Sequence, residues 1–340
     1  MMKINALITS ILLLALLLNT IVTHPAKICR NRLYHGNRKE EHWTQLQYFP
    51  SDAMVESLLD AGGAVFAGTE DGLYRSTDEG KHWMQIKDIP YGTEIKSLLD
   101  ASGTLFAGTY RNKFYRSTDG GNSWTPVKDF PGDTVTSLLD ASGTLFAGTY
   151  ENKLYRSTDG GNNWVSVQDF SGDVVTSLLD VRGTLFAGTY ADGLYHSTDG
   201  GNNWTKVEDN IFDVFAVYSL LDTGDVVFIG TGYGLRCSTD EGKNWTKVTN
   251  FPDYAVYSLL NISGILFTGV ENHGLYRSPD GGKHWMKAIN FPDHTTVYSL
   301  LNVSHTLFAG TDHGLYRSTD GGQSWIQVNE FVSASAGTTE

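Results

Sequence analysis

Short apolar runs alternate with clusters of Gly, Asp, Asn and Ser along most of the chain. In one stretch the runs are Val135–Leu139, Thr144–Thr149, Leu154–Thr158 and Trp164–Gln168. Each run is rich in β-branched, aromatic or aliphatic residues and is bounded by turn-forming residues, which is typical of β-strands. The pattern therefore predicts four short strands, A to D, joined by tight turns.

This four-strand pattern recurs at a fixed period. Tryptophans follow one another every 40 or 41 residues, at Trp43, Trp83, Trp124, Trp164, Trp204, Trp245, Trp285 and Trp325. From Trp83 onward, each closes a Ser-x-Asp-x-Gly-x-x-Trp motif, which gives seven complete copies. The sequence predicts an all-β fold, a seven-bladed β-propeller of four-stranded antiparallel blades, and leaves an extended solenoid as the alternative. The expected blades span approximately 54–90, 95–131, 135–171, 175–212, 217–252, 256–292 and 297–331.

The chain termini are expected to close this ring, with the propeller occupying residues 43–331. The segment around Trp43 copies a D strand without strands A to C before it. The last blade has its own D strand at Trp325–Val328, so either segment could complete the ring. The Ser/Ala/Gly/Thr-rich segment 332–340 is predicted to be a disordered tail.

The first residues resemble an export signal. An apolar run, Ala6–Leu18, follows Lys3 and predicts a signal peptide within residues 1–26, with an uncleaved membrane anchor as the alternative. Residues 27–42 form a basic segment, and no later run is long and apolar enough to cross a bilayer. We therefore expect a secreted protein. Cys29 and Cys237 are its only cysteines, which excludes a disulfide framework and leaves room for one disulfide between them.

The repeated motif resembles the Asp-box, also called the bacterial neuraminidase repeat (BNR), of sialidases, sortilin-type receptors and photosystem II assembly-factor propellers. In such a turn, between strands C and D, Ser and Asp oxygens accept backbone N–H groups, Gly adopts a positive φ, and Trp packs underneath. A structural role is therefore expected for Ser76, Asp78, Gly80, Trp83, Asp119, Trp124, Asp159, Trp164, Asp199, Trp204, Asp240, Trp245, Asp280, Trp285, Asp320 and Trp325.

The order of strands in a blade decides which loops share a face. If A to D run outward from the channel, the D–A and B–C loops meet on one face, here called the entrance face, and the Asp-box turns lie on the other. The loops of the entrance face carry repeated tyrosines and aspartates. Tyrosine rings stack on sugars and carboxylates accept hydrogen bonds from sugar hydroxyls, so this combination is typical of carbohydrate recognition. Duplication of ordinary solvated loops is the alternative. The candidate ligand-binding residues are Tyr110, Tyr150, Tyr190, Tyr233, Asp133, Asp173, Asp213, Asp253 and Asp293.

Strand C carries a second repeated position, and its side chains are mostly cationic. Such a ring could bind anions, or each arginine could join neighbouring blades. The residues at this position are Arg75, Arg116, Arg156, His196, Cys237, Arg277 and Arg317.

Likeness to sialidases raises the question of catalysis. The resemblance implies a triad of arginines and an Arg-Ile-Pro-like motif, neither of which is found here. The arginines of the repeats that lie outside strand C are Arg111 and Arg182, and Arg182 belongs to an A–B loop. Near-identical blades with short loops also lack the distinctive asymmetric site that catalysis needs. We therefore expect a non-catalytic protein, with a divergent or inactive sialidase-like glycoside hydrolase as the alternative.

Charge and the remaining motifs narrow the partners further. The formal net charge is −13, and because the first 42 residues are basic, the rest of the chain is more acidic still. Nucleic acid is therefore an unfavourable partner. No metal-ligand spacing and no cofactor motif occurs, so neither a metal nor a cofactor is expected. Asn203, Asn244, Asn261 and Asn302 lie in Asn-x-Ser/Thr sequons, away from the entrance face. The sequence favours a secreted binding or scaffold propeller that recognises a protein or a glycan.

Overall fold

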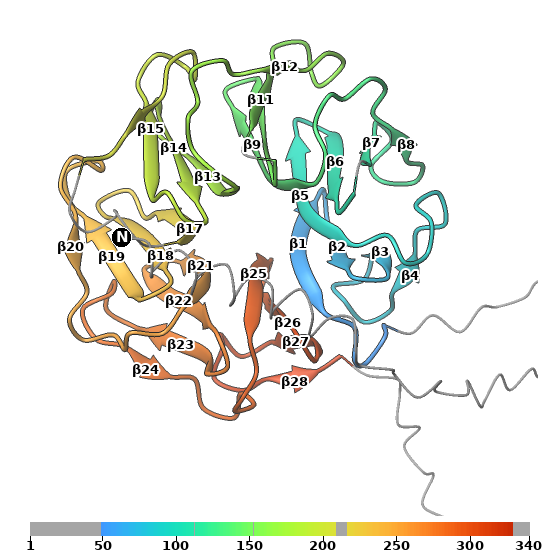
Figure 1. Ribbon diagram of the computed structural model, residues 1–340. Coiled ribbons are helices and arrows are strands. Elements are labelled where there is room, and N and C mark those ends of the chain that lie inside the picture. The colour runs from blue at the N-terminus through green and yellow to red at the C-terminus, as the bar shows by residue number, and fades with distance from the viewer. Residues whose placement is uncertain (1–48, 112, 152, 209–215, 329–340) are drawn as a thin grey trace, which may run out of the picture. The chain divides into compact units, whose positions relative to one another are not determined.

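Seven four-stranded antiparallel sheets form a β-propeller (Figure 1). The computed structural model describes residues 49–111, 113–151, 153–208 and 216–328, and among these it contains strands and no helix. Each sheet takes its four strands from consecutive positions in the chain and forms one blade. The predicted all-β, seven-bladed fold is confirmed.

The strands are numbered in chain order, four to a blade. The first strands, which surround the channel, are β1 (Val55–Ala61), β5 (Ile95–Ala101), β9 (Val135–Ala141), β13 (Val175–Val181), β17 (Val217–Asp222), β21 (Val256–Ile262) and β25 (Val297–Val303). The second strands are β2 (Ala64–Thr69), β6 (Thr104–Thr109), β10 (Thr144–Thr149), β14 (Thr184–Thr189), β18 (Val227–Thr231), β22 (Ile265–Val270) and β26 (Thr306–Thr311).

The two outer strands of each blade are shorter. The third strands are β3 (Gly72–Ser76), β7 (Phe114–Ser117), β11 (Leu154–Ser157), β15 (Leu194–Ser197), β19 (Gly234–Ser238), β23 (Gly274–Ser278) and β27 (Gly314–Ser318). The fourth strands are β4 (Met84–Gln85), β8 (Thr125–Pro126), β12 (Val165–Ser166), β16 (Thr205–Lys206), β20 (Thr246–Lys247), β24 (Met286–Lys287) and β28 (Ile326–Gln327). These last strands are shorter than the sequence predicts, since β12 covers only two residues of the expected run Trp164–Gln168.

The middle of each blade is buried on both faces. In β10, Leu145, Phe146 and Ala147 are all buried, because a neighbouring blade covers each side of the sheet. Gly148 on the same strand lies against Val175 of the next blade so closely that a Cβ atom would stand 2.6 Å from the valine Cβ. The repeated order of small and large residues therefore lets adjacent blades approach closely.

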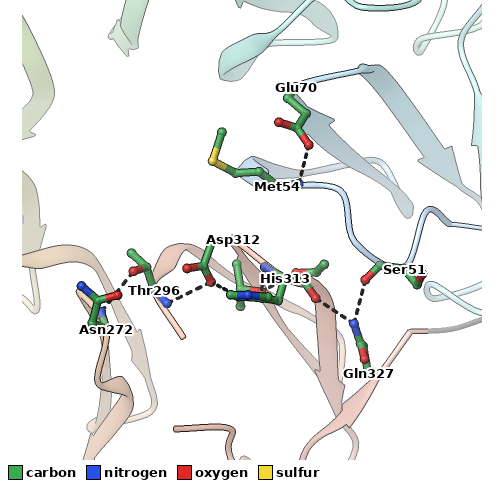
Figure 2. Close-up of polar contacts among 10 residues, drawn as sticks. Ser51, Met54, Glu70, Asn272, Thr296, Asp312, His313 and Gln327 are labelled. Carbon is green, nitrogen blue, oxygen red and sulfur yellow. Dashed lines mark hydrogen bonds and ion pairs between the residues drawn. The ribbon is translucent and has the colours of Figure 1, made fainter. Parts of the chain in front are cut away.

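The ring closes by contact between the first and last blades. Strand β1 lies against β25, and Gly310 of the last blade packs on Val55 in the same way as Gly148 packs on Val175. Phe49 lies in one buried cluster with residues of both blades, and its ring is 5.2 Å from that of Trp83. Figure 2 shows Gln327 at this junction, where its side-chain amide donates to the carbonyl oxygen of Ser51 at 2.8 Å.

The D strand within the last blade is β28, which pairs with β27. Within the described residues, β28 is therefore the fourth strand of the seventh sheet. The segment around Trp43, the signal and basic segments and the tail over 332–340 lie outside the described residues. None of the described residues belongs to a helix that could span a bilayer.

Candidate ligand-binding site

Hydrogen bonds show which loops lie together. The Tyr150 N–H, in the B–C loop, donates to the carbonyl oxygen of Thr134, just before β9, at 3.0 Å. On the other side of the ring, Arg182 of an A–B turn reaches Glu241 of the next blade's C–D turn at 2.7 Å. The D–A and B–C loops therefore share the entrance face, and the motif turns lie opposite.

Each motif turn uses its polar atoms to hold its own backbone. In the first blade the Ser76 hydroxyl accepts the Gly80 N–H at 2.9 Å, and an Asp78 carboxylate oxygen accepts the His82 N–H at 2.9 Å. The Trp83 indole N–H donates to the Gly80 carbonyl oxygen at 3.1 Å. In the third blade, hydrogen bonds from Asn163 lower the pKa of the Asp159 carboxyl to about 2. These groups are engaged in the fold and present little free hydrogen-bonding capacity to a ligand.

The strand C arginines join neighbouring blades. The Arg75 guanidinium donates to the Asn122 side-chain oxygen at 2.7 Å, and Arg116 contacts Asn162 in the same way at 2.6 Å. Each bond links strand C of one blade to the motif turn of the next. Where the series is broken, the Cys237 sulfur lies 3.5 Å from the Thr246 hydroxyl. Its suggested partner, Cys29, lies outside the described residues.

Two of the four sequons lie inside motif turns. The side-chain amides of Asn203 and Asn244 donate to Asp199 and Asp240, each at 2.6 Å. Asn261 and Asn302 lie on the inner strands β21 and β25 and are partly buried.

The tyrosines and aspartates selected from the sequence behave differently from each other. The B–C loop tyrosines are exposed, with Tyr150, Tyr190 and Tyr233 at 58%, 53% and 55% and Tyr110 at 40%. Burial raises the pKa of the Asp133 and Asp173 carboxyls, which also accept hydrogen bonds from B–C loop backbone. Asp253 and Asp293 form ion pairs with Lys247 and Lys287 of their preceding D strands. Asp213 lies outside the described residues.

One cavity opens where the channel meets the entrance face, and it is called the channel mouth below. Its volume is about 360 Å³. The second residue of each inner strand lines it, and Tyr110, Tyr150, Thr134 and Val174 complete the wall. The seven inner-strand residues are Glu56, Lys96, Thr136, Thr176, Tyr218, Tyr257 and Tyr298. At this position the otherwise similar blades differ most in chemistry.

In most blades a small side chain at the second position of the inner strand is paired with a large one at the start of the B–C loop, and the reverse. Where the inner-strand residue is Thr136 or Thr176, the first B–C residue of that blade is Tyr150 or Tyr190. Where the inner-strand residue is a tyrosine, in the last three blades, the first B–C residue is Gly232, Glu271 or Asp312. At these two positions taken together, six blades carry one tyrosine each. The first blade, with Glu56 and Glu70, carries none.

The tyrosines of the last blades form a continuous aromatic wall. Ring centroids are 6.3 Å apart for Tyr190 and Tyr218, 4.6 Å for Tyr218 and Tyr257, and 5.5 Å for Tyr257 and Tyr298. The Tyr257 hydroxyl donates to a carboxylate oxygen of Glu271 at 3.4 Å. Burial, followed by neighbouring tyrosines and Glu271, raises the pKa of the Tyr257 phenol and keeps it neutral. In blades three and four the threonine hydroxyls bond backbone carbonyls, as Thr136 does with Gly148 at 3.0 Å.

A charged trio lies in the first two blades. The Lys96 ammonium contacts a Glu56 oxygen at 2.7 Å and a Glu94 oxygen at 2.5 Å. The side chains are only 26%, 14% and 26% exposed, respectively. Two carboxylates thus share one cation. Within the described residues no group of three or more His, Cys, Asp and Glu side chains is placed to hold a metal ion.

The chain matches the family model of the DUF6242 beta propeller domain over residues 26–136, 79–178 and 126–217. These overlapping matches together cover more than half of the chain. The chain belongs to the DUF6242 β-propeller family. No curated protein matches it in sequence.

Solved structures place this DUF6242 propeller among other propellers. The extracellular domain of BT4673 from B. thetaiotaomicron has a TM-score of 0.68 and 19% identity, over 81% of this chain and 40% of that one. The GH74 xyloglucanase from Xanthomonas campestris has a TM-score of 0.68 and 15% identity, over 84% and 56%. YCF48 bound to D1 peptide has a TM-score of 0.62 and 18% identity, over 79% and 93%. This chain thus spans about two fifths of the length of the BT4673 domain, and the likeness at these identities concerns the fold.

Sequence reasoning did not select the inner-strand residues of this DUF6242 propeller. It selected Tyr110, Tyr150 and Tyr190 from the loops, and the structure joins them to Tyr218, Tyr257 and Tyr298 from the strands. The signal lay in the variation between repeats. Most positions of an inner strand repeat from blade to blade, whereas the second residue changes from Glu to Lys, Thr and Tyr.

The pKa of Glu56 provides a test of this geometry in the DUF6242 propeller. Burial raises it from 4.5 to about 7, against the lowering effect of Lys96. The folded protein therefore binds this proton more tightly than the unfolded chain, and the Glu56 contribution to the free energy of unfolding falls as pH rises from about 4.5 to about 7. We expect the fall to be at most about 3 kcal/mol. Urea unfolding at pH 5 and pH 7.5 should show it in the native protein and not in Glu56→Gln.

The control for this titration is Glu241→Gln, which removes a carboxylate from the opposite face. It should keep the native pH dependence, because Glu241 is exposed and paired with Arg182. Equal pH dependence in the native protein and in Glu56→Gln would show that Glu56 titrates normally.

Proposed function

We propose that this chain is a secreted, non-catalytic binding protein that recognises a segment of another protein at the channel mouth. The observation that carries the proposal is the set of five tyrosines, each from a different blade, that line one cavity. Tyrosine supplies large contact area with little conformational entropy to lose, and it is enriched in the energetically dominant residues of protein interfaces. YCF48 bound to D1 peptide gives a fold-level analogy for peptide binding.

The absence of catalysis is also part of the proposal. Glu56 and Glu94 both form ion pairs with the Lys96 ammonium, so their carboxylates are engaged within the protein. The other side chains that line the cavity are tyrosines, threonines and Val174, and Glu271 contacts the wall from a B–C loop through the Tyr257 hydroxyl. Such a lining fits recognition better than proton transfer.

Two further properties complete the proposal. We infer that the seven Ser-x-Asp-x-Gly-x-x-Trp turns make the chain an Asp-box propeller, supported by the hydrogen bonding of Ser76, Asp78 and Trp83. We infer export from the apolar run Ala6–Leu18, supported by the extracellular placement of the BT4673 domain.

Glycan recognition is the second candidate. It is favoured by the exposed rings of Tyr150, Tyr190 and Tyr233, which present flat faces of the kind that stack on sugars. The similar fold of a xyloglucanase is an analogy in its favour.

Purified protein should be screened on an array of random 12-residue peptides and on a glycan array. We expect saturable peptide binding that Tyr257→Ala/Tyr298→Ala weakens by about 30-fold or more, because the loss of even one energetically dominant interface tyrosine costs about 2 kcal/mol. Tyr91→Ala is the matched control, since Tyr91 is the most exposed tyrosine on a D–A loop and does not line the mouth.

The remaining outcomes discriminate between the candidates. Glycan binding without peptide binding would replace the first candidate by the second. Peptide binding that survives the double substitution would place the site elsewhere and contradict the proposal. Circular dichroism of both variants checks that the ring is intact.

A further inference from the structure

The aromatic surfaces of the mouth are occupied by the protein's own cations on one side of the ring. The Arg111 guanidinium carbon lies 5.0 Å from the centroid of the Tyr110 ring, and the Lys96 ammonium lies 5.9 Å from it. At these distances a cation is attracted by the electron-rich face of the ring. In the second blade, a tyrosine of the mouth therefore forms cation–π contacts with side chains of the protein itself.

The opposite part of the ring has aromatic faces but no such cation. Tyr218, Tyr257 and Tyr298 form the wall described above, and among the described residues no lysine or arginine lies over any of the three rings. These phenols line the cavity together with Glu56 and Lys96. The aromatic wall is thus open to a group from outside.

Carboxylates surround this wall. The first B–C residues of blades six, seven and one are Glu271, Asp312 and Glu70, and Glu56 follows at the channel. Glu271 accepts the Tyr257 hydroxyl and forms no ion pair within the described part of the chain. Its charge helps to raise the pKa of all three wall tyrosines, so its field extends along the whole wall.

The positive charges at the mouth do not balance these carboxylates. Lys96 is shared by Glu56 and Glu94, and Arg111 lies beside Tyr110 in the second blade. In blades six and seven, the B–C loops add the imidazoles of His273 and His313; His313 contacts Asp312 at 2.8 Å (Figure 2), and His273 is stacked on Tyr254. The wall side of the mouth is therefore aromatic and acidic.

We propose that the channel mouth receives a lysine or arginine side chain of a protein ligand, placed against Tyr257 and Tyr298 with Glu271 as its counter-ion. This inference rests on the proposed function and specifies the ligand chemistry of the same site. The aliphatic stem of the side chain contacts the tyrosine faces, while its charged end reaches the carboxylate. Recognition by this pair of features selects against neutral and acidic side chains.

The inference is tested with small probes of matched size. The methylamides of Nα-acetyl-lysine, Nα-acetyl-arginine, Nα-acetyl-norleucine and Nα-acetyl-glutamate are titrated into protein labelled with ¹³C at the tyrosine rings. The Tyr218, Tyr257 and Tyr298 signals are assigned with Tyr→Phe variants. We expect the lysine and arginine probes to shift the Tyr257 and Tyr298 signals saturably, with at least fivefold higher affinity than norleucine and with weaker binding at high salt.

Glu271→Gln should weaken the lysine and arginine probes about threefold to fivefold and leave norleucine unchanged. Glu241→Gln, which removes the same charge on the opposite face, should change neither. Norleucine binding as tightly as lysine, preferred binding of the glutamate probe, or no shift of these tyrosines would each overturn the inference. Because the peptide array does not depend on charge, peptide binding lost in the mouth variant together with any of these results would leave the proposed function standing.

Discussion

Phe49→Ala should lower the free energy of unfolding by about 3–5 kcal/mol, the cost typical of a buried phenylalanine. Phe49 is 2% exposed and packs on Tyr74 and Trp83, with ring centroids 5.3 and 5.2 Å away. The same cluster includes Leu315 and Val328 of the last blade. Removing the ring leaves a cavity at the junction between the first and last blades. Urea unfolding followed by tryptophan fluorescence measures the change.

Phe170→Ala is the matched control for this substitution. Phe170 enters the fourth blade as Phe49 enters the first, and it packs on Tyr195 and Trp204. If the junction is an ordinary blade interface, the two variants should lose similar free energy. A loss below about 1 kcal/mol for Phe49→Ala alone would mean that this residue does not hold the ring closed.

Gly148→Ala should destabilise the protein by about 3 kcal/mol through overpacking. A Cβ atom at this position would lie 2.5 Å from the Ser137 hydroxyl oxygen and 2.6 Å from both Cβ and Cγ1 of Val175. Backbone strain does not contribute, because Gly148 does not have a positive φ. The blades would have to separate to admit one methyl group. Thermal and urea unfolding of the variant measure the loss.

Gly160→Ala separates the steric effect from the backbone effect. Gly160 has a φ of +71° in a motif turn, and a Cβ atom added there would meet no other atom within 4 Å. We expect a cost of only about 1–2 kcal/mol, from the left-handed conformation alone. Equal losses in the two variants would contradict close blade packing as the reason for glycine at position 148.

The fold could be predicted because its signals are local and repeated. Each turn requires Ser, Asp, Gly and Trp at fixed spacing, as in Ser76, Asp78, Gly80 and Trp83, whose hydrogen bonds join residues no more than four apart. Seven repetitions of such a unit indicate the number of blades. Ring closure was only half predictable, because it depends on contact between Phe49 and the last blade, which are remote in sequence.

The candidate site could be predicted only in part, for a physical reason. Exposed loop tyrosines such as Tyr150 stand out in the sequence because their neighbours are polar. Tyr257 stands in a mostly apolar strand, and its alternation with buried Val256 and Ser258 is the same as that of any half-buried strand. Only closure of the ring shows that the free face of this strand lines a channel rather than bulk solvent.

The size compensation between inner strands and B–C loops has a consequence for how specificity could evolve. The packing that joins blades uses Val175 and Gly148, whereas the chemistry of the mouth resides at neighbouring positions such as Thr176 and Tyr190. Under the proposed function, ligand preference would therefore depend on a few variable positions within a repeated fold. Exchange of whole blades would alter the ligand preference of the proposed site while the fold is kept. A substitution at the second residue of an inner strand, paired with a reciprocal change in the B–C loop of that blade, would do the same.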